Sequence, residues 1–147
     1  MKSIIIYEST HHENTKKLVD AIAKKHSVEA VSIENAESVD LSGYDMVGLA
    51  AGIAFGKFYR RMEEFAIKIP SGSRVFLLYT CGNPSDGYVK NITRTLESNG
   101  ARVMGNYGCR GYDTYGPFKL IGGIAKGHPT EEEINGAVAF YESRCLT

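Results

Sequence analysis

The residues best suited to chemistry lie in one stretch near the amino terminus, between an apolar run and a helical pattern. The stretch supplies hydroxyl, amide and imidazole groups, all of which can donate hydrogen bonds. It leads into the amino end of a helix, where the first backbone N–H groups have no intrahelical partner and the helix dipole adds a partial positive charge. We therefore expect a phosphate-binding site here. Its residues are Ser9, Thr10, His11, His12, Asn14 and Thr15.

The same residue types also favour turns and helix caps, so the stretch has a purely structural interpretation as well. The sequence contains neither a Gly-x-x-x-x-Gly-Lys phosphate loop nor a Gly-x-Gly-x-x-Gly dinucleotide fingerprint. A metal site is not expected, because the adjacent His11 and His12 would point in different directions from a turn and have no third ligand nearby. The phosphate interpretation therefore depends on the loops expected to lie beside this one.

Two such loops follow the apolar runs 44–51 and 75–79. The first is bracketed by glycines, which allow a close approach of the backbone to a ligand, and it carries an aromatic residue. Together with a phosphate site, the two loops suit a flat ring system that bears a phosphate. The residues expected from them are Ala51, Gly52, Ile53, Ala54, Phe55, Gly56, Thr80, Cys81, Gly82 and Asn83.

The elements that position these loops follow from the hydrophobic pattern, which alternates between strand and helix. Such alternation implies right-handed crossovers and a mostly parallel sheet with helices on both faces, hence an α/β fold. If the strand order is 2-1-3-4-5, all three loops meet beyond the carboxyl ends of the strands. We expect strands over 2–8, 28–33, 44–51, 75–79 and 102–107, and helices over 14–25, 58–69, 89–98 and 131–141, the last preceded by a capping box at 130–133.

Composition sets limits on the function. At 147 residues the chain is expected to form one domain, and its 43 % hydrophobic content is ordinary for a globular protein. Lys plus Arg equals Asp plus Glu at 17 each, so nucleic acid and anionic membranes are not expected partners. The apolar run at the amino terminus is too short for a signal peptide or a membrane span, which predicts a cytoplasmic protein. Cys81, Cys109 and Cys145 lack metal-site spacing and are interpreted as reduced thiols.

The motifs together resemble the flavodoxin family over essentially the whole chain. They are Tyr-x-Ser-x-His-His-x-Asn-Thr at 7–15, Ala-Gly-Ile-Ala-Phe-Gly-Lys-Phe at 51–58, Gly-Tyr-Asp-Thr-Tyr-Gly-Pro at 111–117 and Gly-Gly-Ile-Ala-Lys-Gly-His-Pro at 122–129. The resemblance implies a single-domain, doubly wound, five-stranded parallel sheet of order 2-1-3-4-5 over 1–147, with one non-covalent FMN. It places the FMN phosphate on the first motif and the isoalloxazine between loops 52–56 and 80–83.

Three departures from the family pattern bear on function. Glu13 stands where the family's phosphate loop usually has glycine, so its carboxylate must point outward if FMN binds. The chain has no Trp to stack on the flavin, which leaves Phe55 or Tyr88 for that role. Flavodoxins that carry electrons are usually strongly acidic, whereas this chain has no net charge, so long-range steering toward a basic partner would be weak.

The resemblance predicts an electron-transfer flavoprotein that serves redox protein partners and needs no catalytic side chain, because the cofactor carries the chemistry. The alternative is an FMN-dependent oxidoreductase acting on a quinone or tetrapyrrole, with a pocket in the long stretch 108–129 lined by Tyr112, Asp113, Tyr115 and Phe118. A flavin-free phosphoreceiver shares the topology, but it would need a carboxylate at the end of the third strand, where this chain has Ala50-Ala51-Gly52. The oligomeric state is left open.

Overall fold

In the computed structural model, residues 1–112 and 123–146 are described, apart from the side chain of His11. Five parallel strands form a sheet in the order β2-β1-β3-β5-β6, which confirms the predicted α/β fold and the reversal of strand order beside β1. Neighbouring loops at this reversal diverge to opposite faces of the sheet and leave a crevice. The five strands are β1 (Ser3–Glu8), β2 (Glu29–Ser32), β3 (Met46–Ala54), β5 (Arg74–Cys81) and β6 (Arg102–Arg110).

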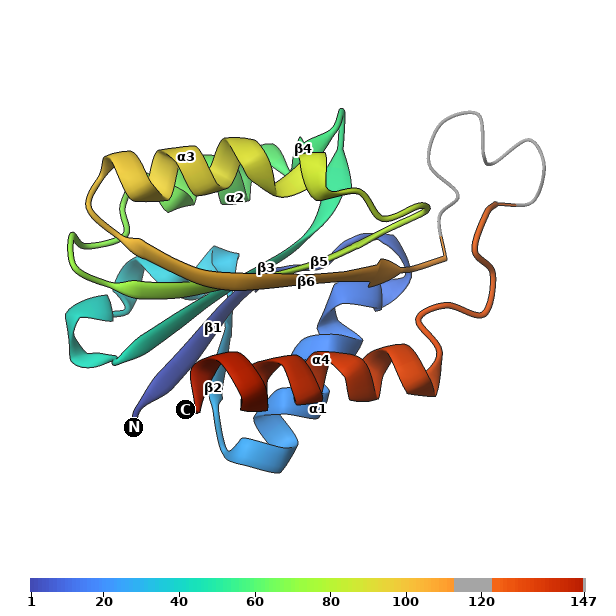
Figure 1. Ribbon diagram of the computed structural model, residues 1–147, viewed down its shortest axis with the longest axis horizontal. Helices are drawn as coiled ribbons and strands as arrows, with labels where there is room; N and C mark the ends of the chain where they lie inside the picture. The colour runs from blue at the N-terminus through green and yellow to red at the C-terminus, as the bar shows by residue number, and fades with distance from the viewer. Residues whose placement is uncertain (113–122, 147) are drawn as a thin grey trace.

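Helices cover both faces of the sheet, two on each face (Figure 1). One face carries α1 (Asn14–His26) and α4 (Glu131–Cys145), and the other carries α2 (Arg60–Ala66) and α3 (Lys90–Ser98). Within the described ranges, no helix combines the length and the apolar character that crossing a membrane requires. Short 3-10 helices occupy four connections: η1 (His11–Glu13), η2 (Ile33–Ser38), η3 (Leu41–Gly43) and η4 (Asp86–Val89).

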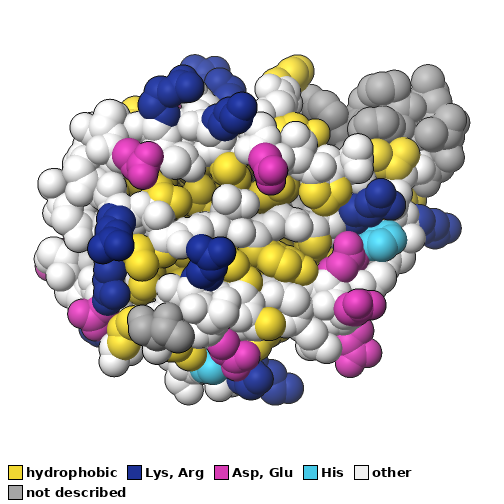
Figure 2. Space-filling model, viewed as in Figure 1, with side chains coloured by type: hydrophobic (Ala, Val, Ile, Leu, Met, Phe, Trp, Pro, Cys, Tyr) yellow, Lys and Arg dark blue, Asp and Glu magenta, His cyan; other side chains and the backbone are white. Residues whose placement is uncertain are grey.

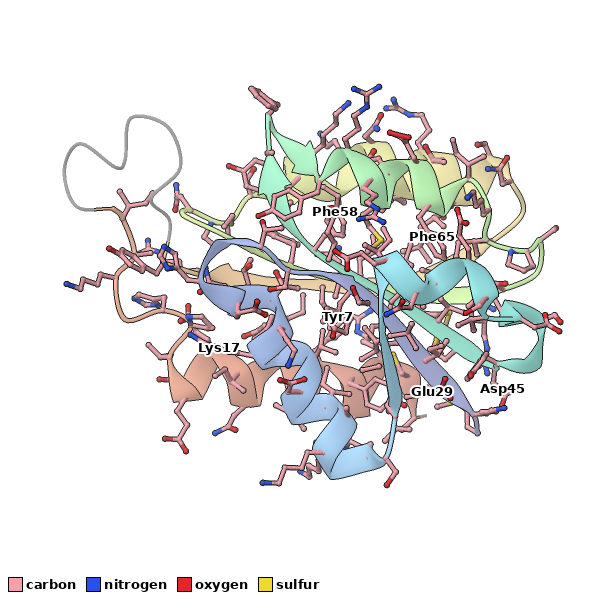
Figure 3. The ribbon with its side chains drawn as sticks, turned by 180° about the vertical axis from the view of Figure 1, so that it is seen from behind. Tyr7, Lys17, Glu29, Asp45, Phe58 and Phe65 are labelled. Atoms are coloured by element: carbon pink, nitrogen blue, oxygen red, sulfur yellow. The ribbon has the colours of Figure 1, made fainter. Side chains whose placement is uncertain are left out.

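The core consists of two apolar layers, one on each face of the sheet. Because successive side chains of a strand point to opposite faces, Ile4 and Ile6 enter the layer under α2 and α3, while Ile5 enters the layer under α1 and α4. Phe58 and Phe65 lie between the sheet and α2 (Figure 3). A strand buried on both faces therefore accounts for the uninterrupted isoleucine run.

Three strands, β3, β5 and β6, extend further at their carboxyl ends than predicted. β3 continues through Gly52–Ala54, which the sequence assigned to a loop. Gly52 pairs with Thr80 of β5, and Ile53 and Ala54 pair with the short antiparallel strand β4 (Lys57–Phe58). The turn between them holds Phe55 and Gly56, both with positive φ (55° and 76°), as tight two-residue hairpin turns require. Phe58 thus belongs to a strand, and the helix predicted over 58–69 begins at Arg60. β5 likewise extends through Cys81, and β6 through Arg110.

The capping box predicted before the last helix is confirmed. Thr130 Oγ1 accepts a hydrogen bond from Glu133 N at 3.1 Å, and Glu133 Oε1 accepts one from Thr130 N at 2.8 Å. Two orphan donors at the start of α4 are thereby satisfied. The capping box fixes where α4 begins, close to the exit of β6.

The three cysteines carry thiols, and we expect these thiols to differ sharply in reactivity. Burial raises the pKa of Cys109 to about 12 and that of Cys145 to about 11, whereas Cys81 is only half-buried. Only the thiolate is nucleophilic, so iodoacetamide at neutral pH should modify at most Cys81 in the native protein and all three thiols in urea. Peptide mass spectrometry checks this. Rapid native labelling of Cys109 would contradict the described packing.

Candidate functional site

A cleft of about 270 Å³ opens beyond the carboxyl ends of β1, β3 and β5, where the strand order reverses. It brings together the three loops that the sequence singled out, although they are far apart along the chain. The predicted residues that line it are Ser9, Thr10, Asn14, Thr15, Ile53, Ala54, Phe55, Gly56, Thr80, Cys81, Gly82 and Asn83.

Of the described residues predicted for the site, three are not among those that line the cleft. Ala51 is fully buried in the core, and Gly52 lies within β3 beneath the ring of Tyr59. His12 is exposed, and its ring stacks on Tyr112 with centroids 4.3 Å apart and an interplanar angle of 28°. The side chain of His11 lies outside the described part of the chain. His12 thus supports a wall of the cleft in this structure.

The amino end of α1 faces this cleft with an unusual backbone. His12 and Glu13 both have left-handed φ values, 54° and 57°, which non-glycine residues rarely adopt. Glu13 occupies the N-cap position, is exposed, and accepts no hydrogen bond from the helix through its side chain. Ser9 Oγ accepts a hydrogen bond from Lys16 N at 3.2 Å. The Glu13 side chain therefore caps none of the first N–H groups of α1, and Ser9 Oγ caps that of Lys16. An anion at this end would use the N–H groups that precede Lys16.

The floor of the cleft is polar and buried. The hydroxyl oxygens of Thr15 and Thr80, 2 % and 5 % exposed, lie 2.8 Å apart and join α1 to β5. Asn14, 6 % exposed, donates through Nδ2 to the carbonyl of Tyr112 at 2.8 Å. Its Oδ1 is buried and has no hydrogen-bond partner among the described residues. Because burying an unpaired acceptor is costly, this oxygen indicates that a ligand donor belongs beside it.

Removing one of the two floor hydroxyls should destabilise the protein. In Thr80→Val the Thr15 hydroxyl loses its buried partner, and we expect the unfolding free energy to fall by about 1–3 kcal/mol. The double variant Thr15→Val/Thr80→Val should lose clearly less than the sum of the single variants, because no hydroxyl is then left unpaired. Urea denaturation of all four proteins measures this coupling. Additive losses would contradict the hydrogen bond.

The opposite side of the cleft is apolar and aromatic. The half-buried Tyr59 and Tyr88 line it, and Tyr59 Oη accepts a hydrogen bond from Thr10 Oγ1 at 3.1 Å. Tyr88 packs edge-on against Tyr79, which donates to the carbonyl of Ser85 at 3.1 Å. Phe55 stands at the mouth, 88 % exposed, on the β3–β4 turn. The cleft therefore has a donor-rich end for an anion and aromatic walls for a flat ring.

Five residues that line the cleft were not in the set predicted to bind the cofactor. They are Tyr59, Gly111 and Ile124, together with Tyr88, considered only for stacking on the ring, and Tyr112, proposed for a substrate pocket. Tyr59 directly follows the hairpin. The apolar spacing over 58–69 predicted a helix there, so Tyr59 was not expected at the cleft. A Cβ at Gly111 would lie 2.6 Å from Asn14 Nδ2, so this glycine lets the exit of β6 approach α1. Such a contact between distant segments leaves no local sequence signal. Asp113, Tyr115 and Phe118, proposed for a substrate pocket, lie outside the described residues.

The fold is that of a doubly wound α/β protein, with a cleft at the reversal of its strand order that is polar at one end and aromatic at the other. The family model described as a flavodoxin domain matches residues 4–111. The chain therefore belongs to the flavodoxin family, as the sequence motifs predicted.

Individual proteins resemble this chain in sequence or in structure. An uncharacterized protein of Methanocaldococcus jannaschii is 36 % identical over 146 residues, with 97 % of each chain covered. A flavodoxin from the domain Archaea has a similar structure, with a TM-score of 0.65 and 18 % identity over 97 % of this chain and 98 % of its own. A mutant Fusobacterium nucleatum flavodoxin bound to flavin mononucleotide has a TM-score of 0.63 and 16 % identity over 98 % and 95 %. At these identities the two structures support the fold alone.

Proposed function

We propose that the chain binds FMN in this cleft and carries electrons, one at a time, between redox proteins. The main support is that the amino end of α1 and several aromatic side chains meet in a single cleft. Membership of the flavodoxin family supports FMN over other phosphorylated ligands. So does the flavin mononucleotide in the Fusobacterium nucleatum flavodoxin.

The residues at the donor-rich end fit a phosphate ester with a polyol chain. The backbone N–H groups at the start of α1, with the hydroxyl of Ser9, would hold the phosphate. Thr10 would join them by turning its hydroxyl proton from Tyr59 Oη to the anion. The buried Asn14 Oδ1 needs a donor, which a ribityl hydroxyl would supply. Thr15 is already bonded to Thr80, and we assign it to holding α1 on the sheet rather than to the anion.

The aromatic end fits the ring system. Tyr59 and Tyr88 would flank the isoalloxazine, and the backbone of Thr80–Asn83 would face its edge. When bound, FMN supplies the redox chemistry, and the protein contributes orientation and electrostatics. The apolar walls exclude water and disfavour a build-up of negative charge on the ring. Phe55 at the mouth would shield the side that the cleft leaves open.

The surface charge bears on the partners we propose. Side chains of both signs are interspersed over the face seen in Figure 2, and the chain has no net charge. Redox proteins would therefore meet this chain with little long-range steering, and electron transfer should depend weakly on ionic strength. We place this exchange in the cytoplasm. Of the four pocket residues proposed for the oxidoreductase alternative, Tyr112 lines this same cleft, and the other three lie outside the described part of the chain.

A titration with FMN and with riboflavin tests the proposal. The two ligands share the ring and the ribityl chain and differ only in the phosphate. We expect FMN fluorescence to be quenched on binding, and riboflavin to bind at least about a hundredfold more weakly, because several charge-assisted hydrogen bonds are lost. Equal affinities would remove the phosphate site from the proposal, and binding of neither ligand would remove the proposed function.

A further inference from the structure

Tyr112 forms a wall of the cleft, yet it lies in no strand or helix. Contacts from two distant segments, 12–14 and 128, hold it in place. Its N–H donates to the carbonyl of His128 at 2.9 Å, its carbonyl accepts from Asn14 Nδ2 at 2.8 Å, and its ring stacks on His12. The position of this wall therefore depends on those neighbours rather than on regular secondary structure.

His128 is itself fixed by a carboxylate outside the cleft. Its Nδ1 lies 2.5 Å from Glu133 Oε1, and the two side chains are 29 % and 23 % exposed. Burial alone would raise the pKa of Glu133, but hydrogen bonds from Thr130 N, His128 and Arg110 N lower it below its usual value. Glu133 is thus ionised at neutral pH and can only accept, so Nδ1 of His128 is the donor.

Glu133 is anchored to the sheet at two points. Its Oε2 accepts a hydrogen bond from Arg110 N at 3.3 Å, and its carbonyl accepts one from the hydroxyl of Tyr107 at 2.8 Å. Both donors come from β6, while Glu133 itself belongs to the first turn of α4. The end of β6, the start of α4 and His128 are therefore held together as one unit, next to the cleft but not part of its lining.

We propose that Glu133 and His128 are positioning residues for the FMN site: the Glu133 carboxylate orients His128, whose carbonyl holds Tyr112 against Asn14 and so sets the width of the cleft. This inference rests on the proposed FMN binding. It assigns a functional role to the histidine of the 122–129 segment and to the acidic start of α4.

Three variants test the role of His128. His128→Ala removes the donor to Glu133, and His128→Asn retains a donor near the position of Nδ1. Tyr141→Phe is the matched control, because it removes a buried hydrogen bond from α4 to Ser3 Oγ, at the other end of the same helix. FMN dissociation from the loaded proteins is followed by stopped-flow fluorescence, visible circular dichroism reports the surroundings of the bound ring, and thermal melting reports stability.

We expect FMN to leave His128→Ala about tenfold faster than wild type, the loss expected for one hydrogen bond to a charged group. The dichroism of the bound ring should change in the same variant. His128→Asn should restore both properties, and Tyr141→Phe should lower the melting temperature without altering either. If FMN leaves His128→Ala at the wild-type rate, or leaves Tyr141→Phe as fast as it leaves His128→Ala, the inference is overturned while FMN binding stands. Failure of wild type to bind FMN would overturn the proposed function and this inference together.

Discussion

Replacing Glu13 with glycine should raise the affinity for FMN about tenfold. The carboxylate stands at the N-cap of α1, beside the position proposed for a phosphate dianion. Its repulsion at the surface amounts to about 1–2 kcal/mol at an intermediate effective dielectric. Glycine also adopts the φ of 57° without the steric cost that a side chain incurs. Fluorescence titration at low and at high salt measures the gain, which should shrink as salt screens the charge.

Glu13→Gln distinguishes the effect of the charge from the effect of the left-handed backbone conformation. It removes the carboxylate but keeps a side chain in the left-handed conformation, so most of the gain in affinity should remain. Glu97→Gln, on the exposed surface of α3, is the matched control for a change in net charge and should bind FMN like wild type. If Glu13→Gln binds no better than wild type, repulsion between Glu13 and the ligand is not what limits affinity.

Two alanine substitutions in β3 should have different effects, one mainly on the stability of the fold and the other mainly on the affinity for FMN. A Cβ at Gly48 would overlap the ring of Phe76, which is fully buried, whereas a Cβ at Gly52 would overlap the ring of Tyr59, which lines the cleft. Gly48→Ala should therefore lower the unfolding free energy by about 1–3 kcal/mol, the usual cost of overpacking a core. Gly52→Ala should displace Tyr59 and weaken FMN binding by about tenfold or more, at a smaller cost in stability.

Urea denaturation without ligand and FMN titration of the folded variants measure the two effects separately. Gly48→Ala should bind FMN like wild type under conditions in which it is fully folded. The reverse pattern, with binding lost in Gly48→Ala and retained in Gly52→Ala, would contradict the placement of Tyr59 beside the ring.

Much of the fold could be predicted because its signals are local. The isoleucine run 4–6 indicates a strand buried on both faces, and Thr130 with Glu133 marks the start of α4. The alternation of strands and helices then restricts the topology to a few parallel arrangements. The convergence of the three loops follows from that topology, since parallel strands bring their carboxyl ends to one edge.

The remaining features depend on contacts that leave no local signal. The β3–β4 turn places Phe55 at positive φ, where glycine or asparagine is usual, so the sequence shows no hairpin and the apolar spacing continues as a helix. Tyr112 becomes a cleft wall only through Asn14, His12 and His128, which approach it from elsewhere in the chain. His12 was predicted to bind phosphate, but its ring contacts that tyrosine instead of lining the cleft.

Anaerobic reductive titration of the FMN-loaded protein shows whether this chain holds FMN as a one-electron carrier. Absorption spectra recorded against a series of redox indicators give the midpoint potential of each electron. We predict two resolved one-electron steps, with the second at a markedly lower potential because the apolar cleft resists further negative charge. Reduction in a single two-electron step would contradict that role and favour a two-electron oxidoreductase.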